Sequence, residues 1–184
     1  RVSLTSEEKA SLEAACSQAK YLEGPAVYNR CIADHLARLA SAPRRPDLSN
    51  ISQSERESIE AACSQAKYLE GPAAYNRCLQ GQFARWAAGP SQPNLSGLST
   101  PERQSIEATC SQAKYLEGAA AYNRCLRDQL ASWAAAPRRP DLTTLSSAER
   151  QSIEAVCSQA KYLQGPAAYN RCLIRQLALL KGRE

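Results

Sequence analysis

The sequence predicts an all-α protein, a tandem, solenoid-like array of four helical hairpins, each stapled by one intra-repeat disulfide. Three observations predict this fold. A block beginning CSQAKYL recurs every 47 residues without an insertion, and a fixed period of this size indicates stacked supersecondary units. Each copy has two apolar stripes with helical spacing on either side of a glycine. Each copy also contains two cysteines at fixed positions. The predicted copies span 1–47, 48–94, 95–141 and 142–184 and form one continuous array.

The first helix of each copy is expected to begin at a capping box. In the first copy Thr5 and Glu8 have the spacing in which a hydroxyl and a carboxylate satisfy free N–H groups at a helix start. The same pairs recur as Ser52 with Glu55, Ser99 with Glu102 and Ser146 with Glu149. From this start we expect one continuous helix, whose buried face contains Leu12, Ala15, Cys16, Ala19 and Leu22.

A glycine separates the first helix from the second. Gly24 is placed to end the first helix, and Pro25 is placed at the first position of the next, where proline is tolerated. Such a tight connection predicts an antiparallel helical hairpin. Linkers such as residues 42–52 each contain two prolines, which stop the second helix and stiffen the connection. The second apolar face comprises Tyr28, Cys31, Ile32, Leu36 and Leu39.

The hairpin geometry predicts how the eight cysteines pair. Cys16 lies eight residues before Gly24 and Cys31 lies seven after it, so the two thiols should meet at the same height on facing helices. A bond that closes a loop of this length contributes about 3 kcal/mol in the chain-entropy model, which matters in a unit too small for a large core. The predicted pairs are Cys16–Cys31, Cys63–Cys78, Cys110–Cys125 and Cys157–Cys172.

Four disulfides would place the protein in an oxidising, extracytoplasmic compartment: the periplasm, the cell surface or the secreted fraction. The alternative interpretation is a cysteine-based zinc or copper protein. Against it, no two cysteines lie three or four residues apart on one helix, and His35 is the only histidine. We therefore expect disulfides, with no cofactor and no bound metal.

Catalysis is not expected. Ser17 and Lys20 have the Ser-x-x-Lys spacing of some hydrolases, and the pair recurs in every copy. The accompanying Lys-Thr-Gly and Ser-Asp-Asn elements are missing from the sequence. His35 is replaced by glutamine in the other three copies, which favours a surface or inter-repeat position over a catalytic one.

The composition limits the classes of partner that we expect the protein to bind. The net charge of +5 arises from interleaved acidic and basic residues, a distribution that does not favour nucleic-acid binding. No apolar run approaches transmembrane length, so membrane insertion is not expected. A monomer is expected.

The predicted function is a structural spacer or protein-interaction scaffold, natural or consensus-like by design. Polar and aromatic residues that are identical in all copies suggest a repeated surface for a protein partner. In the first copy these residues are Lys20, Tyr21, Asn29 and Arg30. Their equivalents are Lys67, Tyr68, Asn76, Arg77, Lys114, Tyr115, Asn123, Arg124, Lys161, Tyr162, Asn170 and Arg171.

The residues Ala19, Tyr21, Gly24 and Tyr28 have a spacing that resembles part of a tetratricopeptide unit. The resemblance covers about ten residues of each copy, and the period, the cysteine pair and the proline-rich linker all depart from that family. It implies only that the hairpins stack on one another.

Overall fold

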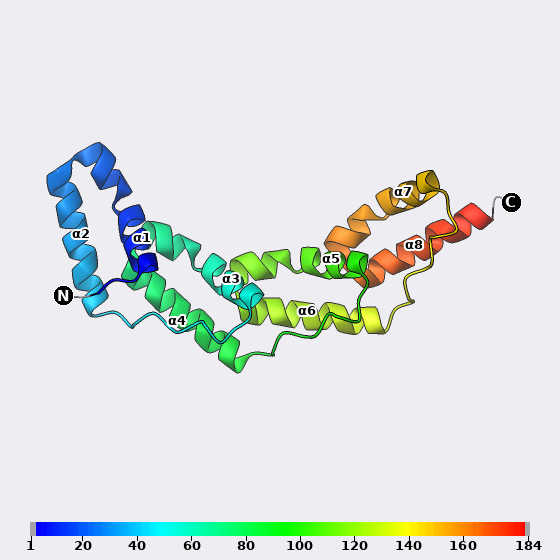
Figure 1. Ribbon diagram of the computed structural model, residues 1–184, viewed down its shortest axis with the longest axis horizontal. Helices are drawn as coiled ribbons and strands as arrows, with labels where there is room; N and C mark the ends of the chain where they lie inside the picture. The colour runs from blue at the N-terminus through cyan, green and yellow to red at the C-terminus, as the bar shows by residue number, and fades with distance from the viewer. Residues whose placement is uncertain (1–2, 183–184) are drawn as a thin grey trace. The chain divides into compact units, whose positions relative to one another are not determined.

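The computed structural model describes residues 3–182, and all regular structure in that range is helical (Figure 1). Each copy contains an α-helix, a short π-helical segment and a second α-helix. The first two copies contain α1 (Ser6–Ala15), η1 (Ala19–Glu23), α2 (Pro25–Ala40), α3 (Gln53–Ala62), η2 (Ala66–Glu70) and α4 (Pro72–Ala88). The last two contain α5 (Thr100–Thr109), η3 (Ala113–Glu117), α6 (Ala119–Ala134), α7 (Ser147–Val156), η4 (Ala160–Gln164) and α8 (Pro166–Lys181). This arrangement confirms the four predicted helical hairpins.

The predicted capping boxes are present at the first helix of every hairpin. At α5, the Glu102 backbone N–H donates to the Ser99 hydroxyl oxygen, and the Ser99 N–H donates to the Glu102 carboxylate. Equivalent bonds begin α1, α3 and α7. These bonds satisfy N–H groups that the first turn of a helix leaves without partners.

The first arm of each hairpin is not the single α-helix that the sequence predicted. In the first copy α1 ends at Ala15, with Cys16 as its C-cap. The chain then widens into η1, where the Gly24 N–H donates to the Ala19 carbonyl five residues earlier. A wider turn changes the angular position of the side chains that follow it. Leu22 is therefore 78% exposed, so its predicted place on the buried face was wrong.

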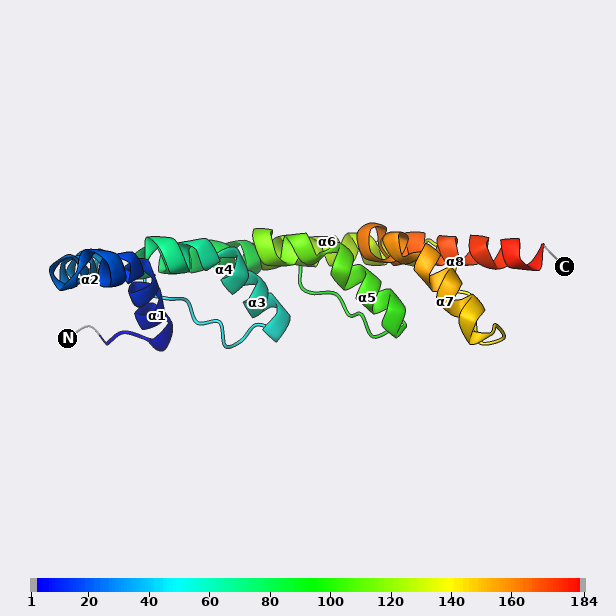
Figure 2. The same cartoon turned by 90° about the horizontal axis from the view of Figure 1, so that it is seen from above.

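A glycine with positive φ reverses the chain after each π-helical segment. Gly24, Gly71, Gly118 and Gly165 have φ between 89° and 99°, a region that residues with a Cβ rarely adopt. In each hairpin the two arms converge towards this turn, as Figure 1 and the rotated view in Figure 2 show. Pro25, Pro72 and Pro166 then begin the second helix where the sequence predicted it, with Ala119 in the same position of the third copy.

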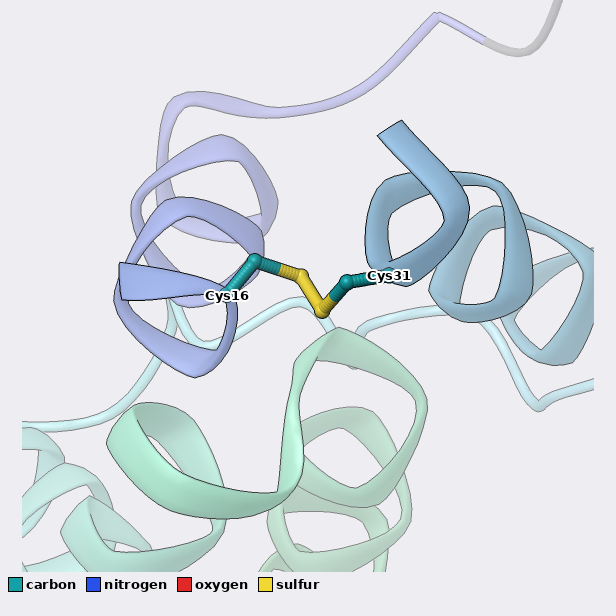
Figure 3. The surroundings of a disulfide bond; sticks show 2 residues. All are labelled: Cys16 and Cys31. Carbon is teal, nitrogen blue, oxygen red and sulfur yellow. A yellow bond between two sulfur atoms is a disulfide. The ribbon is translucent and has the colours of Figure 1, made fainter. Parts of the chain in front are cut away.

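All four predicted disulfides are present. Cys16 and Cys31 join the end of α1 to the middle of α2, with their Cα atoms 5.9 Å apart (Figure 3). The other three pairs have Cα–Cα distances of 5.7 Å. Cys16, Cys63, Cys110 and Cys157, the first cysteine of each pair, are fully buried or nearly so. The disulfide therefore lies inside its hairpin.

The chain forms two compact units. The first contains the described residues up to Pro90 together with Lys114–Ala120, the turn of the third hairpin. Its main core surrounds Ile59, Tyr75 and Leu79. The second contains Ser91–Ala113 and the described residues from Ala121 onwards, with cores around Ile106 and Leu126 and around Tyr169 and Leu173.

The linkers between hairpins pack on these cores and form ion pairs with the helices. The linker residues Leu48 and Leu142 are buried. Arg45 forms an ion pair with Glu60, with an N–O distance of 3.0 Å, and Arg139 forms one with Glu154 at 3.4 Å. Each of these ion pairs attaches a linker to the helix that follows it.

We expect loss of one disulfide to loosen its own hairpin most. The double substitution of Cys16 and Cys31 by alanine removes the loop closure, which costs about 3 kcal/mol. In amide hydrogen exchange, α1 and α2 should lose protection while α7 and α8 keep theirs, because stability in repeat proteins is a nearest-neighbour property. An equal loss of protection in all four hairpins would contradict this local role.

Candidate protein interface

The four residue types predicted to form a partner surface do not lie in one kind of environment. The tyrosines of the π-helical segments and the arginines near the start of each second helix are exposed. Asn29 is also exposed, but Asn76, Asn123 and Asn170 are buried. The prediction that these three asparagines belong to an exposed surface was wrong.

The buried asparagines connect one hairpin to the preceding one. In the first unit the Asn76 side-chain N–H donates to Glu8 Oε1 at 2.9 Å. In the second unit Asn170 donates to Glu102 Oε1 at 2.9 Å and to the Pro137 carbonyl oxygen at 3.3 Å. A side chain that is needed inside the protein in this way is not available to a partner.

The acceptor in this contact is a capping-box glutamate, and Glu102 accepts hydrogen bonds from three residues at once. One carboxylate oxygen of Glu102 accepts from Ser99, and the other accepts from Asn170 and from the Trp133 indole N–H at 2.7 Å. Burial alone would raise the pKa of Glu102, but the hydrogen bonds from Asn170, Trp133 and Ser99 hold this pKa below its ordinary value. This role could not be predicted from the glutamate alone, but the recurrence of Trp86 and Trp133 one period apart was a signal for it.

The lysines of the predicted surface are also used within the protein. Lys161 Nζ lies 5.0 Å from the ring centroid of Tyr162 and 5.7 Å from that of Tyr169, within cation–π range. The Lys161 backbone carbonyl accepts a hydrogen bond from the buried hydroxyl of Ser105 in the preceding hairpin. Lys67 in the first unit has the same arrangement, with its carbonyl bonded to Ser11 at 2.6 Å and its ammonium paired with Glu7.

The ion pair with Glu7 also favours the protonated, positively charged form of Lys67. Burial alone would lower the pKa of Lys67, but the hydrogen bond to Glu7 and the neighbouring tyrosines raise it above its ordinary value. The Ser-x-x-Lys pair that contains this lysine therefore includes a protonated ammonium with a structural partner. A general base needs the opposite shift, a pKa lowered towards neutrality.

Every turn exposes two large apolar side chains, a tyrosine and the leucine that follows it. Tyr21 is 75% exposed and Leu22 is 78% exposed in the first hairpin. In the other hairpins the tyrosines are about half exposed and the leucines 68–72%. We call these eight residues the turn surface: Tyr21, Leu22, Tyr68, Leu69, Tyr115, Leu116, Tyr162 and Leu163.

His35 lies where one hairpin meets the next, one of the two positions that the sequence suggested for it. Its imidazole lies so close to Gly71 that a Cβ at Gly71 would overlap with the ring. Burial lowers the pKa of His35, and the positive charge of the nearby Arg38 lowers it further. Gln82 and Gln129 contact Gly118 and Gly165 in the same way, so this position serves packing between hairpins.

The cysteines do not form a metal site. Among the described residues, only Cys16, Cys31 and His35 bring three potential metal-ligating atoms together. Both sulfurs of that group are joined in a disulfide, and no described cysteine is free. Because metal coordination by cysteine requires a thiolate, the alternative prediction of a cysteine-based zinc or copper protein was wrong.

The buried asparagines should matter for stability and the exposed one should not. Replacing Asn170 by alanine removes a hydrogen bond to a buried carboxylate and should lower the free energy of unfolding by about 1–3 kcal/mol. The matched substitution Asn29→Ala should change it by less than about 0.5 kcal/mol. Urea unfolding followed by circular dichroism measures both, and equal effects would contradict the assigned contact.

A second matched pair of variants tests the packing at the glycine turns. Gly24→Ala and Gly71→Ala both place a Cβ at positive φ, which costs about 1–2 kcal/mol. Only Gly71→Ala also crowds His35, which should add about 1–3 kcal/mol. Combining Gly71→Ala with His35→Ala should remove the added cost in a double-mutant cycle. A cycle without coupling would show that the two residues do not press on each other.

No described helix combines the length and the apolar character needed to cross a membrane. Comparison with protein-family models, with curated proteins and with solved structures found no match to this chain.

Proposed function

We propose that this protein is a non-enzymatic, disulfide-stabilised scaffold of the extracytoplasmic space that binds a protein partner through the turn surface. The observation that carries the proposal is the exposure of a tyrosine and a leucine at the turn of each of the four hairpins. The proposal rests on the exposure of these side chains and not on their identity among the copies, because neutral residues in recently duplicated copies are also identical.

The chemistry of the turn surface suits protein recognition. Tyrosine offers an apolar ring with a polar tip and is enriched in protein interfaces. Single exposed leucines are common, but here every leucine of the turn surface lies next to an exposed tyrosine. Exposed Arg30, Arg77, Arg124 and Arg171, near the start of the second helices, add positive charge that would favour an acidic rim on the partner.

The local structure supports the same proposal by holding the turn surface rigid. A buried disulfide and a positive-φ glycine flank each exposed pair. Lys20, Lys67, Lys114 and Lys161 each place the ammonium within 5.0–5.4 Å of the exposed tyrosine's ring centroid. An ordered side chain loses less conformational entropy on binding, and four equivalent pairs allow multivalent attachment.

The proposal also includes an extracytoplasmic location and a role without catalysis. Four disulfides are consistent with an oxidising, extracellular or periplasmic environment. The raised pKa of Lys67 does not suit proton abstraction from a serine. The proposed role therefore rests on presenting a surface and not on reacting with a substrate.

The turn surface should be dispensable for folding and required for binding. In a quadruple variant, Tyr68, Leu69, Tyr115 and Leu116 are all replaced by serine, and a matched control carries Val156→Ser, which removes a 61% exposed side chain away from the turns. The immobilised protein is incubated with the extracellular fraction of its source, and bound proteins are quantified by mass spectrometry. We expect the quadruple variant to lose about tenfold or more of its specific partner, and the control to retain it.

The melting temperature decides between a binding role and a structural one. Substitutions at exposed sites should leave it nearly unchanged. Unchanged capture by the quadruple variant, or a large fall in its melting temperature, would assign the turn surface to the fold and contradict the proposal.

A further inference from the structure

The first hairpin has a leucine where the second and third hairpins have a tryptophan. Leu39 near the end of α2 is equivalent to Trp86 in α4 and Trp133 in α6. The Trp86 indole N–H donates to Glu55 Oε1 at 2.8 Å, and the Trp133 indole N–H donates to Glu102 Oε1 at 2.7 Å. Leucine has no donor, so the capping-box glutamate of the first hairpin lacks a hydrogen bond that its equivalents receive.

The glutamate in question, Glu8, is a buried anion with an acceptor oxygen in reserve. Its Oε2 accepts from the Thr5 backbone N–H at 2.9 Å, whereas within residues 3–182 its Oε1 accepts from Asn76 alone. Burial alone would raise the pKa of Glu8, but the hydrogen bonds from Asn76 and Thr5 hold this pKa below its ordinary value. Because a carboxylate oxygen has two lone pairs, Oε1 can accept a second N–H.

A cavity of about 650 Å³ lies beside Glu8, and Leu39, Arg44 and Asn76 are among its other lining residues. Sites for small organic groups have volumes of about 300–1,000 Å³. The cavity walls come from the capped end of the first hairpin, from the linker that follows it and from the second hairpin, all within the first unit. Figure 1 shows this linker leaving the end of α2 and passing α4. The second hairpin therefore already covers this side of the first, and the residue at position 39 is what leaves the site without an indole.

We propose that this cavity binds an indole group from outside the chain. The bound ring would pack on Leu39 and donate its N–H to Glu8, as the internal indoles do to the equivalent glutamates. Arg44 is exposed and lines the cavity, so its guanidinium can stack on the open side of the ring. The ligand chemistry is a planar aromatic ring with one N–H donor, supplied by a free indole-type molecule or by a tryptophan side chain of a partner.

The indole site is separate from the turn surface. It lies at the capped end of the hairpin, and no residue of the turn surface lines the cavity. The proposal therefore goes beyond the proposed function and does not depend on it.

A pair of ligands with the same shape tests the hydrogen bond. The oxidised, full-length chain is titrated with indole and with benzofuran, which has an oxygen in place of the N–H group. Because leucine also occupies this position in the fourth hairpin, as Leu180, binding is followed locally through the nuclear magnetic resonance signals of the Asn76 side-chain amide. Indole should cause a saturable shift, and benzofuran should bind about tenfold more weakly because it cannot donate to a carboxylate. Equal binding of the two ligands, or no shift with indole, would overturn the proposal.

The tripeptide Gly-Trp-Gly distinguishes the two sources of the ring. If it binds at least as tightly as indole, the natural ligand is a tryptophan side chain of a partner. If indole binds and the tripeptide is excluded, the natural ligand is a free small molecule.

Filling the cavity from within should block the site. Leu39→Trp supplies the chain's own indole, as in the second and third hairpins, and should abolish the indole-dependent shift while the melting temperature is maintained. The matched control Ala33→Trp places the same side chain at an exposed position of α2 and should bind indole like the unmodified chain. Indole binding at Asn76 that survives Leu39→Trp would contradict the proposed site.

The reciprocal substitution should create a site. Trp133→Leu removes the indole from the third hairpin, where Glu102 and Asn170 hold the positions of Glu8 and Asn76. With circular dichroism confirming that the variant is folded, indole should shift the Asn170 side-chain amide, which it does not affect in the unmodified chain. A folded variant whose Asn170 does not respond would show that a missing indole is not what makes the site.

The quadruple serine variant of the turn surface keeps the two proposals distinguishable. It should bind indole with unchanged affinity even where it loses its protein partner, because the cavity lies outside the substituted turns. Loss of indole binding in that variant would show that the ring binds at the turns, and would overturn the cavity as the site.

Discussion

The rest of the structure depends on one covalent constraint, the disulfide that joins the two arms of each hairpin. It ties the end of the first α-helix to the second helix just before the chain widens into its π-helical segment. Because both arms are fixed at this height, the turn beyond them has a defined position. The bond therefore also places the side chains that the turn exposes and the carbonyl that accepts a hydrogen bond from the neighbouring hairpin.

A second interaction extends this order from one hairpin to the next. The capping-box glutamate begins its own helix and also accepts hydrogen bonds from a tryptophan in the same hairpin and an asparagine in the next, as Glu102 does. A buried carboxylate with several donors is stable as an anion. Helix initiation and contact between hairpins are thus coupled through a single side chain.

The fold and the disulfides could be predicted because they follow from local spacing. Cys16 and Cys31 lie almost equally far from Gly24, and Thr5 and Glu8 form a capping box by sequence distance alone. The exposure of Leu22 could not be predicted, since it depends on a hydrogen bond across five residues that an ideal helical period does not contain. Nor could the burial of Asn170 be predicted, because identity among copies does not distinguish a buried contact from an exposed one. The predicted surface was therefore only partly correct: its tyrosines and arginines are exposed, but Asn76, Asn123 and Asn170 are buried.

The bond from a serine to the lysine carbonyl of the neighbouring hairpin has a practical consequence. Its acceptor belongs to the main chain, so every amino acid at that site supplies the same oxygen atom. The side chain there can change without loss of this hydrogen bond, and the leucine two residues later is largely exposed. The hairpin is thus suited to diversification: its tip can be randomised in a library, copy by copy, while the main-chain acceptor of the serine bond is retained.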